Sequence, residues 1–287
     1  MTSMCCLTGQ GAVPVYDVHC HMLPGVDDGA RTREMAVDMA RMAAADGITH
    51  LACTPHIYPG LFENNADGIA RALAAFRRLL EEQGVALELC HGADIQVVPE
   101  LLGKLRSGVF PTINGSRYFL FEPPHHVPLV NFSRLVEDAL SAGFVPVITH
   151  PERLSWLDTH YQEFLAAARA GAWMQITAGS LCGRFGSAPR YWAERMLDEG
   201  VVHLLATDAH NLRSRPPLLA EGRVAAARIV GSEEAYRLVV DRPALVWRDG
   251  DPDEVCRPPG LGAEARNRKE RKRGLFSRLV TRGKLSA

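Results

Sequence analysis

Short apolar runs alternate with longer amphipathic stretches over most of the chain. The runs are typical of buried β-strands, and the stretches carry apolar residues at helical spacing and commonly stop at a glycine, as helices do. Strands are expected at about residues 13–18, 50–54, 86–91, 118–121, 145–149, 173–177 and 203–207. Helices are expected at about residues 32–47, 67–83, 99–106, 133–142, 161–170, 189–199, 217–230 and 233–240.

Strand and helix thus alternate about seven times, and the strands are too continuously apolar for a sheet with one exposed face. This pattern predicts an α/β fold of parallel βα units with both sheet faces covered. A doubly wound open sheet and a closed barrel both fit it. Polar residues at the strand ends favour the barrel, because a ring of strand ends brings their side chains to one centre.

Metal-type side chains follow six of the seven expected strands at the same end. His19 and His21 follow the first strand, and residues i and i+2 of an extended chain point to the same side. A single histidine after a strand is commonly structural, and a single carboxylate commonly caps a helix. Eight such placements together predict a metal site. The candidate ligands are His19, His21, His56, Asp94, Glu122, His150, Asp208 and His210, with Asp28 in the turn after the first strand.

These ligands are too many for one ion, since a tetrahedral site takes about four and an octahedral site about six. Their mixture of imidazole and carboxylate favours Mn²⁺, Fe²⁺ or Zn²⁺. Clustered ions of this kind serve in phosphoester hydrolysis. Arg153 and Arg215 could bind a phosphate through forked hydrogen bonds, although surface or helix-capping roles are the alternative for both. His125 and His126 are expected beside the site or exposed, not as ligands.

Several other catalytic signatures are absent from the sequence. No cysteine is followed by arginine at the Cys-x5-Arg spacing of thiol phosphatases, and no Gly-x-Ser-x-Gly elbow occurs. Neither a P-loop nor a dinucleotide-binding fingerprint follows any expected strand. Nucleophilic serine or cysteine chemistry is therefore poorly supported.

Composition adds further limits. The 287 residues suit one large domain, and the net charge of −1 argues against a surface built for nucleic acid. Seven cysteines with no CxxC pair are typical of a reducing compartment. Neither a signal peptide nor a run of about 20 apolar residues is found, so a cytoplasmic protein is expected. The sequence gives no basis for an oligomeric state.

The ends of the chain differ from its middle. We expect an N-terminal extension at residues 1–14, the barrel at 15–250 and a basic tail at 251–287. Residues 266–273 carry six basic side chains and one acid, and apolar residues follow them. A solvated tail is one interpretation. The other is an amphipathic anchor that makes a peripheral contact with an anionic membrane or an acidic partner.

The ordered motifs resemble the PHP (polymerase and histidinol phosphatase) superfamily. They are Asp17-Val18-His19-Cys20-His21, Cys53-Thr54-Pro55-His56, Gly92-Ala93-Asp94, Phe121-Glu122, Thr149-His150-Pro151-Glu152-Arg153 and Thr207-Asp208-Ala209-His210-Asn211. Within that superfamily, the turn Val26-Asp27-Asp28-Gly29 and residues 211–217 are most similar to the bacterial capsule-type, manganese-dependent protein-tyrosine phosphatases of the CpsB/CapC family. The similarity covers about residues 15–248.

The resemblance implies a distorted seven-stranded (β/α)7 TIM-like barrel, the PHP fold, with three metal ions at its carboxyl-terminal mouth. It also implies that Arg153 and Arg215 bind the phosphate and that Asp208 belongs to the catalytic residues. Asp94 departs from the pattern, because this branch usually has the longer glutamate there. The implied ligand sets are His19, His21, Asp94 and Asp208 for the first ion, Asp94, Glu122 and His150 for the second, and Asp28, His56 and His210 for the third.

The same resemblance implies a substrate. Family members dephosphorylate the tyrosine-rich tails of bacterial tyrosine kinases that control capsule or exopolysaccharide export. Two alternatives stay open. One is a phosphatase for a small phosphomonoester such as histidinol phosphate, and the other is a non-catalytic regulator that keeps the metals and binds the kinase tail.

Overall fold

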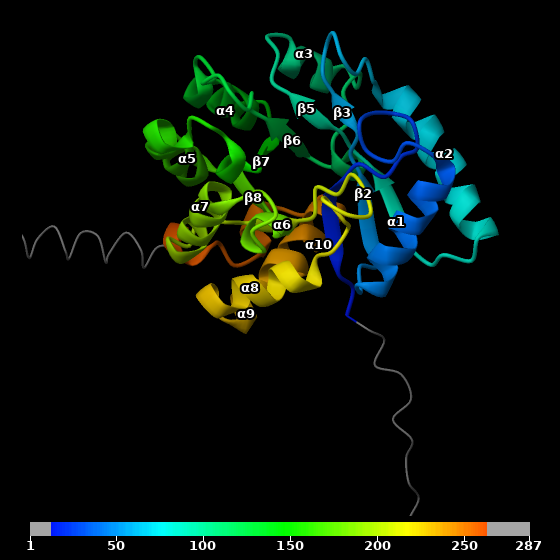
Figure 1. Cartoon of the computed structure of the whole chain (residues 1–287). Coiled ribbons are helices and arrows are strands. Elements are labelled where there is room, and N and C mark those ends of the chain that lie inside the picture. Colours follow the sequence, from blue (N-terminus) through cyan, green and yellow to red (C-terminus); the bar gives the residue numbers. More distant parts are fainter. Residues whose placement is uncertain (1–12, 263–287) are drawn as a thin grey trace, which may run out of the picture.

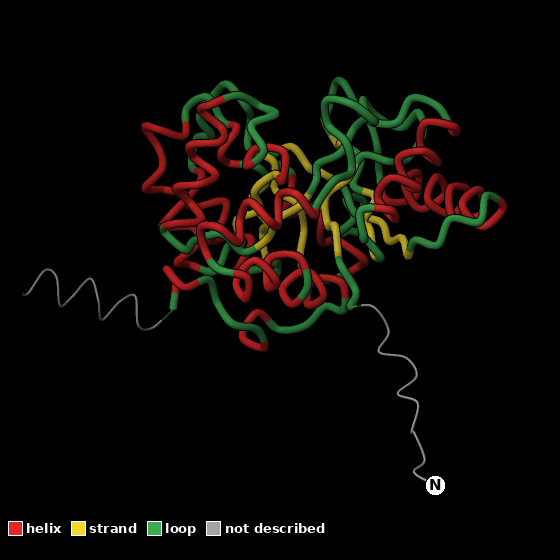
Figure 2. Tube along the Cα trace, turned by 60° about the horizontal axis from the view of Figure 1, so that its bottom comes forward, coloured by secondary structure: helices red, strands yellow, loops and turns green. Residues whose placement is uncertain are grey.

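Helices surround a centre of short parallel strands in the computed structural model, which describes residues 13–262 (Figures 1 and 2). The strands are β1 (Tyr16–Cys20), β2 (His50–Cys53), β3 (His56–Ile57), β4 (Glu88–His91), β5 (Asp94–Gln96), β6 (Tyr118–Glu122), β7 (Val145–Thr149), β8 (Trp173–Thr177) and β9 (Leu204–Ala206). The α-helices are α1 (Arg33–Ala45), α2 (Ala66–Glu82), α3 (Leu101–Arg106), α4 (Phe132–Ser141), α5 (Leu157–Ala170), α6 (Ala178–Leu181), α7 (Ser187–Asp198), α8 (Ala220–Val230), α9 (Ser232–Val239) and α10 (Asp241–Trp247).

The strands form two parallel sheets, in the orders β1-β2-β4 and β3-β5-β6-β7-β8-β9. The α/β class with parallel strands is confirmed. The strand count differs from the expected seven, because β3 and β5 begin just after β2 and β4 and belong to the other sheet. Pro55 separates β2 from β3, and a proline cannot donate a backbone hydrogen bond to the ladder.

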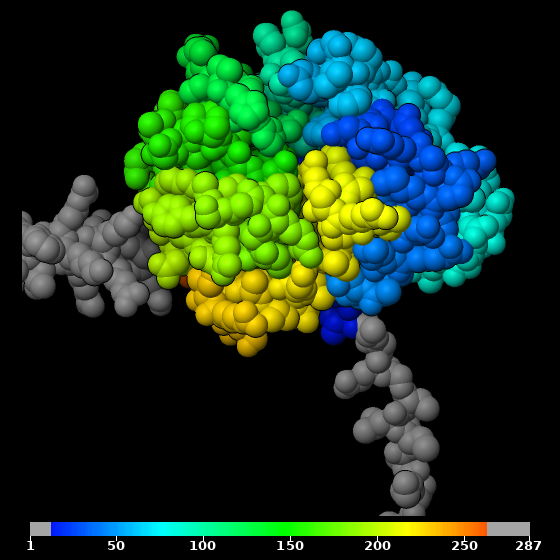
Figure 3. Space-filling view, in the orientation of Figure 1, coloured from blue at the N-terminus to red at the C-terminus, as the bar shows by residue number. Residues whose placement is uncertain are grey.

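The larger sheet returns to β1 through the residues after β9. The backbone N–H of Asp208 donates to the carbonyl of His19 at 2.8 Å, and that of His21 donates to the carbonyl of Ala209 at 2.9 Å. Figure 3 shows the same relationship, with the yellow chain after β9 lying against the blue N-terminal part. The strand ends are therefore arranged around a common centre, although the described strands do not form one continuous hydrogen-bonded barrel.

Apolar residues of the strands divide between two clusters. One of them, called here the inner cluster, includes Val18, Ala52 and Val147. In β6, Tyr118 and Leu120 belong to the inner cluster, whereas Phe119 and Phe121 pack with the helices. Strands buried on both faces explain why the sequence shows continuous apolar runs instead of alternation. The inner cluster also receives side chains from α10. The sequence pattern did not predict α10, whose Pro243 lies in the first turn, where proline is tolerated.

Residues 251–262, which the sequence assigned to the tail, contact the main body of the protein. The backbone N–H of Gly260 donates to the carbonyl of Gly200, after α7, at 2.8 Å. The basic run, for which a membrane contact was one of two interpretations, and nearly all of the N-terminal extension lie outside the described residues. None of the described helices is long and apolar enough to cross a membrane.

Candidate metal centre

The candidate ligands come together where the strands end. All nine lie in overlapping groups whose nitrogen and oxygen atoms are within 4.8 Å of one another. His19, Glu122, His56 and Asp94 lie inside strands, not after them as expected. His56 and Asp94 are the first residues of β3 and β5. These two short strands pair with each other beyond the breaks that follow β2 and β4.

Local backbone features aim these side chains inward. The register of β1 against β2 shifts between Asp17 and Cys20, which marks a bulge, and a bulge can re-aim a side chain. This explains why His19 reaches the centre although its neighbour Val18 also faces the inner cluster. His150 and Asp208 have φ values of 33° and 49°, in the left-handed region that is uncommon for non-glycine residues.

His19 and His21 point their Nε2 atoms at each other, 3.1 Å apart. The Nδ1 atom of His19 lies 2.8 Å from the side-chain oxygen of Gln175, and that of His21 lies 2.7 Å from a carboxylate oxygen of Asp27. When both rings are neutral, each Nδ1 donates its proton to its acceptor and each Nε2 keeps a free lone pair. Two lone pairs aimed at one point repel unless a cation lies between them.

Carboxylates border this pair of imidazoles. His19 Nε2 lies 3.3 Å from Asp94 and 3.3 Å from Asp208, and His21 Nε2 lies 3.2 Å from Asp208. Asp94 and Asp208 are buried. These four side chains match the set that the resemblance implied for the first ion.

His56 lies between two further groups. Its Nδ1 is 3.5 Å from Asp94 and 3.4 Å from Glu122, while its Nε2 is 3.6 Å from Asp28. His210 Nε2 lies 3.4 Å from the same Asp28 oxygen. Asp28, His56 and His210 therefore lie together as the resemblance implied for the third ion.

Glu122 and His150 form the remaining group with Asp94. The His150 Nε2 atom is 3.8 Å from a carboxylate oxygen of each acid. His125, expected only beside the site, places its Nε2 3.5 Å from Glu122 and stays partly exposed. Its side chain also forms, with Glu122 and His150, one of the groups that could hold a metal ion.

The donor atoms fit divalent ions. Within the described chain, several buried atoms lack a hydrogen-bond partner, and such atoms are costly to leave unpaired. A divalent cation would satisfy several of them at once, which is the chemistry expected of imidazole and carboxylate ligands. The unpaired atoms are Nδ1 of His56 and His150, both carboxylate oxygens of Asp94, Oδ1 of Asp208 and Nε2 of His210.

Charge in the centre also favours cations. Burial by itself lowers the pKa of His19, but the carboxylates of Asp94 and Asp208 outweigh burial and raise this pKa to about 9. The site therefore attracts positive charge, whether a proton or a metal. His150 differs, because burial and the Arg153 guanidinium lower its pKa to about 4. Its imidazole is neutral at neutral pH, as a metal ligand must be.

Arg153 and Arg215 meet on one carboxylate. Both guanidinium groups pair with Oδ2 of Asp208, Arg215 at a distance of 2.6 Å. Burial alone would raise the pKa of Asp208, but Arg215, His19 and Arg153 outweigh it and hold the pKa well below its ordinary value. The Nε atom of Arg215 is buried and has no hydrogen-bond partner among the described residues. It is a donor suited to an anion beside the metal centre.

Comparison with known proteins agrees with this geometry. The sequence model of the family described as "Capsular polysaccharide synthesis, CpsB/CapC" matches residues 15–248. The chain belongs to the CpsB/CapC family.

Named relatives of this family are tyrosine phosphatases. The tyrosine-protein phosphatase YwqE of Bacillus subtilis is 31% identical over 233 residues, 81% of this chain and 91% of that protein. The tyrosine-protein phosphatase CpsB of Streptococcus pneumoniae is 29% identical over 245 residues, 82% of this chain and 99% of that protein.

A solved structure has the same fold. It comes from a study of B. subtilis YwqE and S. pneumoniae CpsB, described as metal-dependent tyrosine phosphatases, and superposes with a TM-score of 0.81 at 30% identity. The match covers 85% of this chain and 97% of that one. A lactonase from Listeria monocytogenes, with a TM-score of 0.50 and 13% identity over 82% of this chain and 94% of its own, shares the fold alone.

The sequence motifs of this CpsB/CapC family member did not assign a role to every residue that contacts the site. Gln175 and Asp27 each hold a histidine ring, and Asp17 accepts hydrogen bonds from the backbones of His19, at 3.3 Å, and Thr207, at 3.0 Å. Gln175 stands out in the sequence as the lone amide in an apolar strand, and that signal could have found it. Asp27 belongs to the turn Val26-Asp27-Asp28-Gly29, but the sequence pattern assigned it no role.

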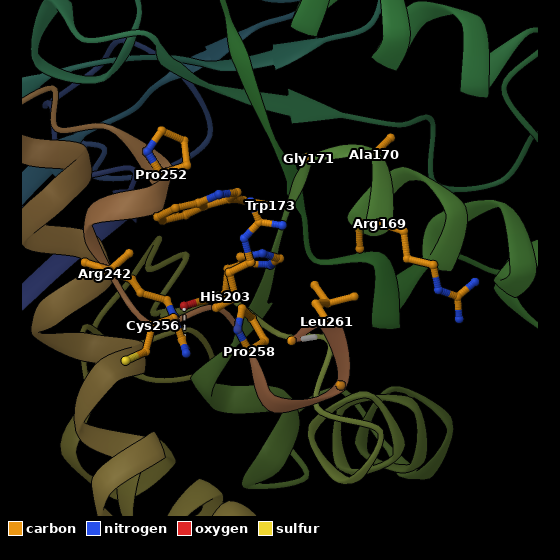
Figure 4. Close-up of a pocket in the computed structure, with 15 residues that line it drawn as sticks. Arg169, Ala170, Gly171, Trp173, His203, Arg242, Pro252, Cys256, Pro258 and Leu261 are labelled. Carbon is orange, nitrogen blue, oxygen red and sulfur yellow. Dashed lines mark hydrogen bonds between the residues drawn. The ribbon is translucent and has the colours of Figure 1, made fainter. Parts of the chain in front are cut away.

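A separate cavity of about 160 Å³ lies at the opposite ends of β8 and β9 (Figure 4). Trp173 stacks there on His203, with ring centroids 5.1 Å apart. The buried Arg242 pairs with Glu234 at 2.7 Å and donates to the carbonyl of Cys256 at 3.0 Å. The charge of Arg242 is thus paired within the wall of this cavity, on the amino-terminal side of the strands.

Proposed function

We propose that this protein is a metal-dependent phosphatase that hydrolyses phosphotyrosine in proteins. One observation carries the proposal: five overlapping groups of histidines and carboxylates lie beside two arginines that share Asp208. The named phosphatase relatives and the metal-dependent solved structure support the same conclusion.

The proposed centre holds three divalent ions, with manganese as the expected metal and Fe²⁺ or Zn²⁺ as alternatives. The nine clustered side chains would hold them in the three sets that the resemblance implied. Ions bound there would supply a nucleophile at neutral pH and neutralise charge on the phosphoryl group. Gln175 and Asp27 keep the rings of His19 and His21 in the tautomer that leaves each Nε2 free to bind.

Arg153 and Arg215 would bind the phosphate. Asp208 holds one edge of each guanidinium, which leaves the remaining N–H groups for the oxygens of the substrate. Because both guanidinium groups are fixed before the substrate arrives, less entropy is lost on binding. Since its pKa is held low, Asp208 stays ionised and orients the arginines instead of donating a proton. A tyrosine phenol, with a pKa near 10, needs less protonation to depart than an alkyl alcohol.

The substrate in the cell is proposed to be the phosphotyrosine tail of a bacterial tyrosine kinase that controls capsule or exopolysaccharide production. The description of the family as one of capsular polysaccharide synthesis supports this assignment. A cytoplasmic location and a peripheral membrane contact through the basic tail are parts of the same proposal.

Hydrolysis of a phosphotyrosine peptide and of histidinol phosphate, with added Mn²⁺ and with chelator, tests the proposal. We expect turnover that favours the peptide, stops with chelator and is lost in His150→Ala. Preference for histidinol phosphate would keep the metal centre but assign a small-molecule phosphatase. Binding of metal and peptide without turnover would support the non-catalytic regulator instead.

A further inference from the structure

Besides Asp208, the two arginines share Phe185 as a neighbour. The ring of Phe185 lies under the guanidinium of Arg153, with 4.4 Å between the guanidinium carbon and the ring centroid. The corresponding distance for Arg215 is 6.0 Å. Cation–π contacts of this kind hold a guanidinium over an aromatic face. Phe185 is partly exposed, so part of its side chain remains open to a ligand.

The loop that carries Phe185 is held firmly. It runs from α6 to α7, and the backbone N–H of Arg184 donates to the carbonyl of Gly179 at 2.9 Å. A Cβ atom at Gly179 would stand 3.2 Å from the Phe185 ring, so the ring packs closely on that backbone. Arg184 also forms an ion pair with Glu221 of α8. These contacts fix the position of the ring relative to the arginines.

Glu152 connects the chain before this loop to Arg153. It directly precedes Arg153, and its carboxylate accepts hydrogen bonds from the backbone of Thr177 at 2.9 Å and the hydroxyl of Ser180 at 2.8 Å. Arg153 and the start of the loop therefore belong to one connected unit. The place of the aromatic ring beside the guanidinium groups is a built feature of the fold.

This arrangement bears on the leaving group of the substrate. In an aryl phosphate, one oxygen separates phosphorus from the aromatic ring, so a phosphate held by Arg153 and Arg215 places that ring close to them. Phe185 is the aromatic side chain that contacts both arginines. Another ring near the centre, Phe62, stacks on His56 at 5.8 Å and lies on the side of the third ligand group.

We propose that Phe185 is a specificity-determining residue, whose partly exposed ring packs against the aromatic ring of an aryl phosphate held by the two arginines. The inference rests on the proposed function. Edge-to-face packing of two rings strengthens binding by roughly three- to tenfold beyond simple burial. An alkyl phosphate has no ring to receive this contact and binds through the phosphate alone.

Calorimetric titration of the manganese-loaded protein with benzylphosphonate, in which one carbon separates phosphorus from the ring, and ethylphosphonate tests the proposal without requiring turnover. We expect the wild type to bind benzylphosphonate about tenfold more tightly, Phe185→Leu to reduce this preference to about twofold, and Phe185→Tyr to keep it. Tyr191→Leu, an exposed aromatic change on α7, serves as the control that leaves the preference intact. Thermal melting checks that each variant is folded.

Three results would overturn the inference: no preference in the wild type, an unchanged preference in Phe185→Leu, or a loss of preference in Phe62→Leu and not in Phe185→Leu. An unchanged preference with equal weakening of both ligands in Phe185→Leu would show that the ring only supports Arg153. Failure of the proposed function is distinguishable, since it would appear as absent turnover of the phosphotyrosine peptide.

Discussion

Asp27 accepts a hydrogen bond from Nδ1 of His21 at 2.7 Å, and the same carboxylate oxygen accepts one from the backbone N–H of His56 at 2.9 Å. Its other oxygen accepts from the backbone of Gly29 at 2.9 Å. One buried carboxylate thus fixes two candidate ligands and the turn that carries Asp28. Burial tends to raise the pKa of Asp27, but His21 outweighs it and lowers the pKa.

Asp27→Asn should weaken manganese binding by about tenfold to a hundredfold. The amide has a single oxygen, so it cannot accept all three hydrogen bonds, and His21 loses its fixed ring orientation. Calorimetric titration with Mn²⁺ measures the change. Asp38→Asn removes the same charge from the exposed face of α1 and should leave the affinity as it is. Equal affinities for wild type and Asp27→Asn would exclude the positioning role.

Arg215→Lys should reduce kcat/KM for a phosphotyrosine peptide by about ten- to a hundredfold. A lysine keeps the charge but cannot pair with Asp208 and the phosphate at once, and one charged hydrogen bond contributes about 1.5–3 kcal/mol. Arg213→Lys is the matched control, because Arg213 is an exposed neighbour in the same loop. Similar losses in the two variants would show that the loop matters and not the guanidinium of Arg215.

Gly222→Ala should lower the free energy of unfolding by about 1–3 kcal/mol. A Cβ atom there would lie 2.5 Å from that of Ala178, so α6 and α8 would have to separate. Gly103→Ala in α3 meets no atom within 4 Å and should stabilise the protein by up to about 1 kcal/mol, since glycine is unfavourable inside a helix. Urea denaturation compares the pair, and a neutral Gly222→Ala would contradict the close packing.

His203→Asn should make stability less sensitive to acid. Burial, followed by the charges of Arg242 and Arg257, lowers the pKa of His203 well below its ordinary value of 6.5. As pH falls below that value, the unfolded chain binds a proton that the folded protein does not, so folding stability is lost by up to about 1.4 kcal/mol per pH unit. Asparagine can still accept the 3.1 Å hydrogen bond from the backbone of Met174.

Urea denaturation at several pH values between about 7.5 and 5 measures this difference. The wild type and His203→Asn are compared by the slope of unfolding free energy against pH, because the substitution also changes packing against Trp173. The slope should be shallower in the variant. Parallel slopes would mean that His203 does not account for acid sensitivity.

Much of the candidate site could be predicted because its ligands follow local patterns. His19 and His21 stand at the end of an apolar run, and Asp208 and His210 stand at the end of another. Hydrophobic periodicity depends on neighbours in the sequence, so it can be read without the fold. Parallel strands then bring their carboxyl ends to the same side, which brings distant residues into one cluster.

Other features had no local signal. Gln175 and His19 are 156 positions apart, and Phe185 meets Arg153 across a loop whose path follows from helix packing. The bulge in β1 arises from pairing with β2, not from residues within β1 alone.

The sequence by itself therefore determined the α/β class, the order of most of the elements and the residue types at the strand ends. Only the tertiary structure decided that Asp208 is shared by two arginines, that Asp27 and Gln175 hold the histidine rings, and that Phe185 lies against Arg153. The physical reason is the distance along the sequence over which each feature arises. Burial patterns arise from each segment and its own periodicity, whereas hydrogen-bond partners, ion pairs and ring contacts exist only once separate segments are packed together.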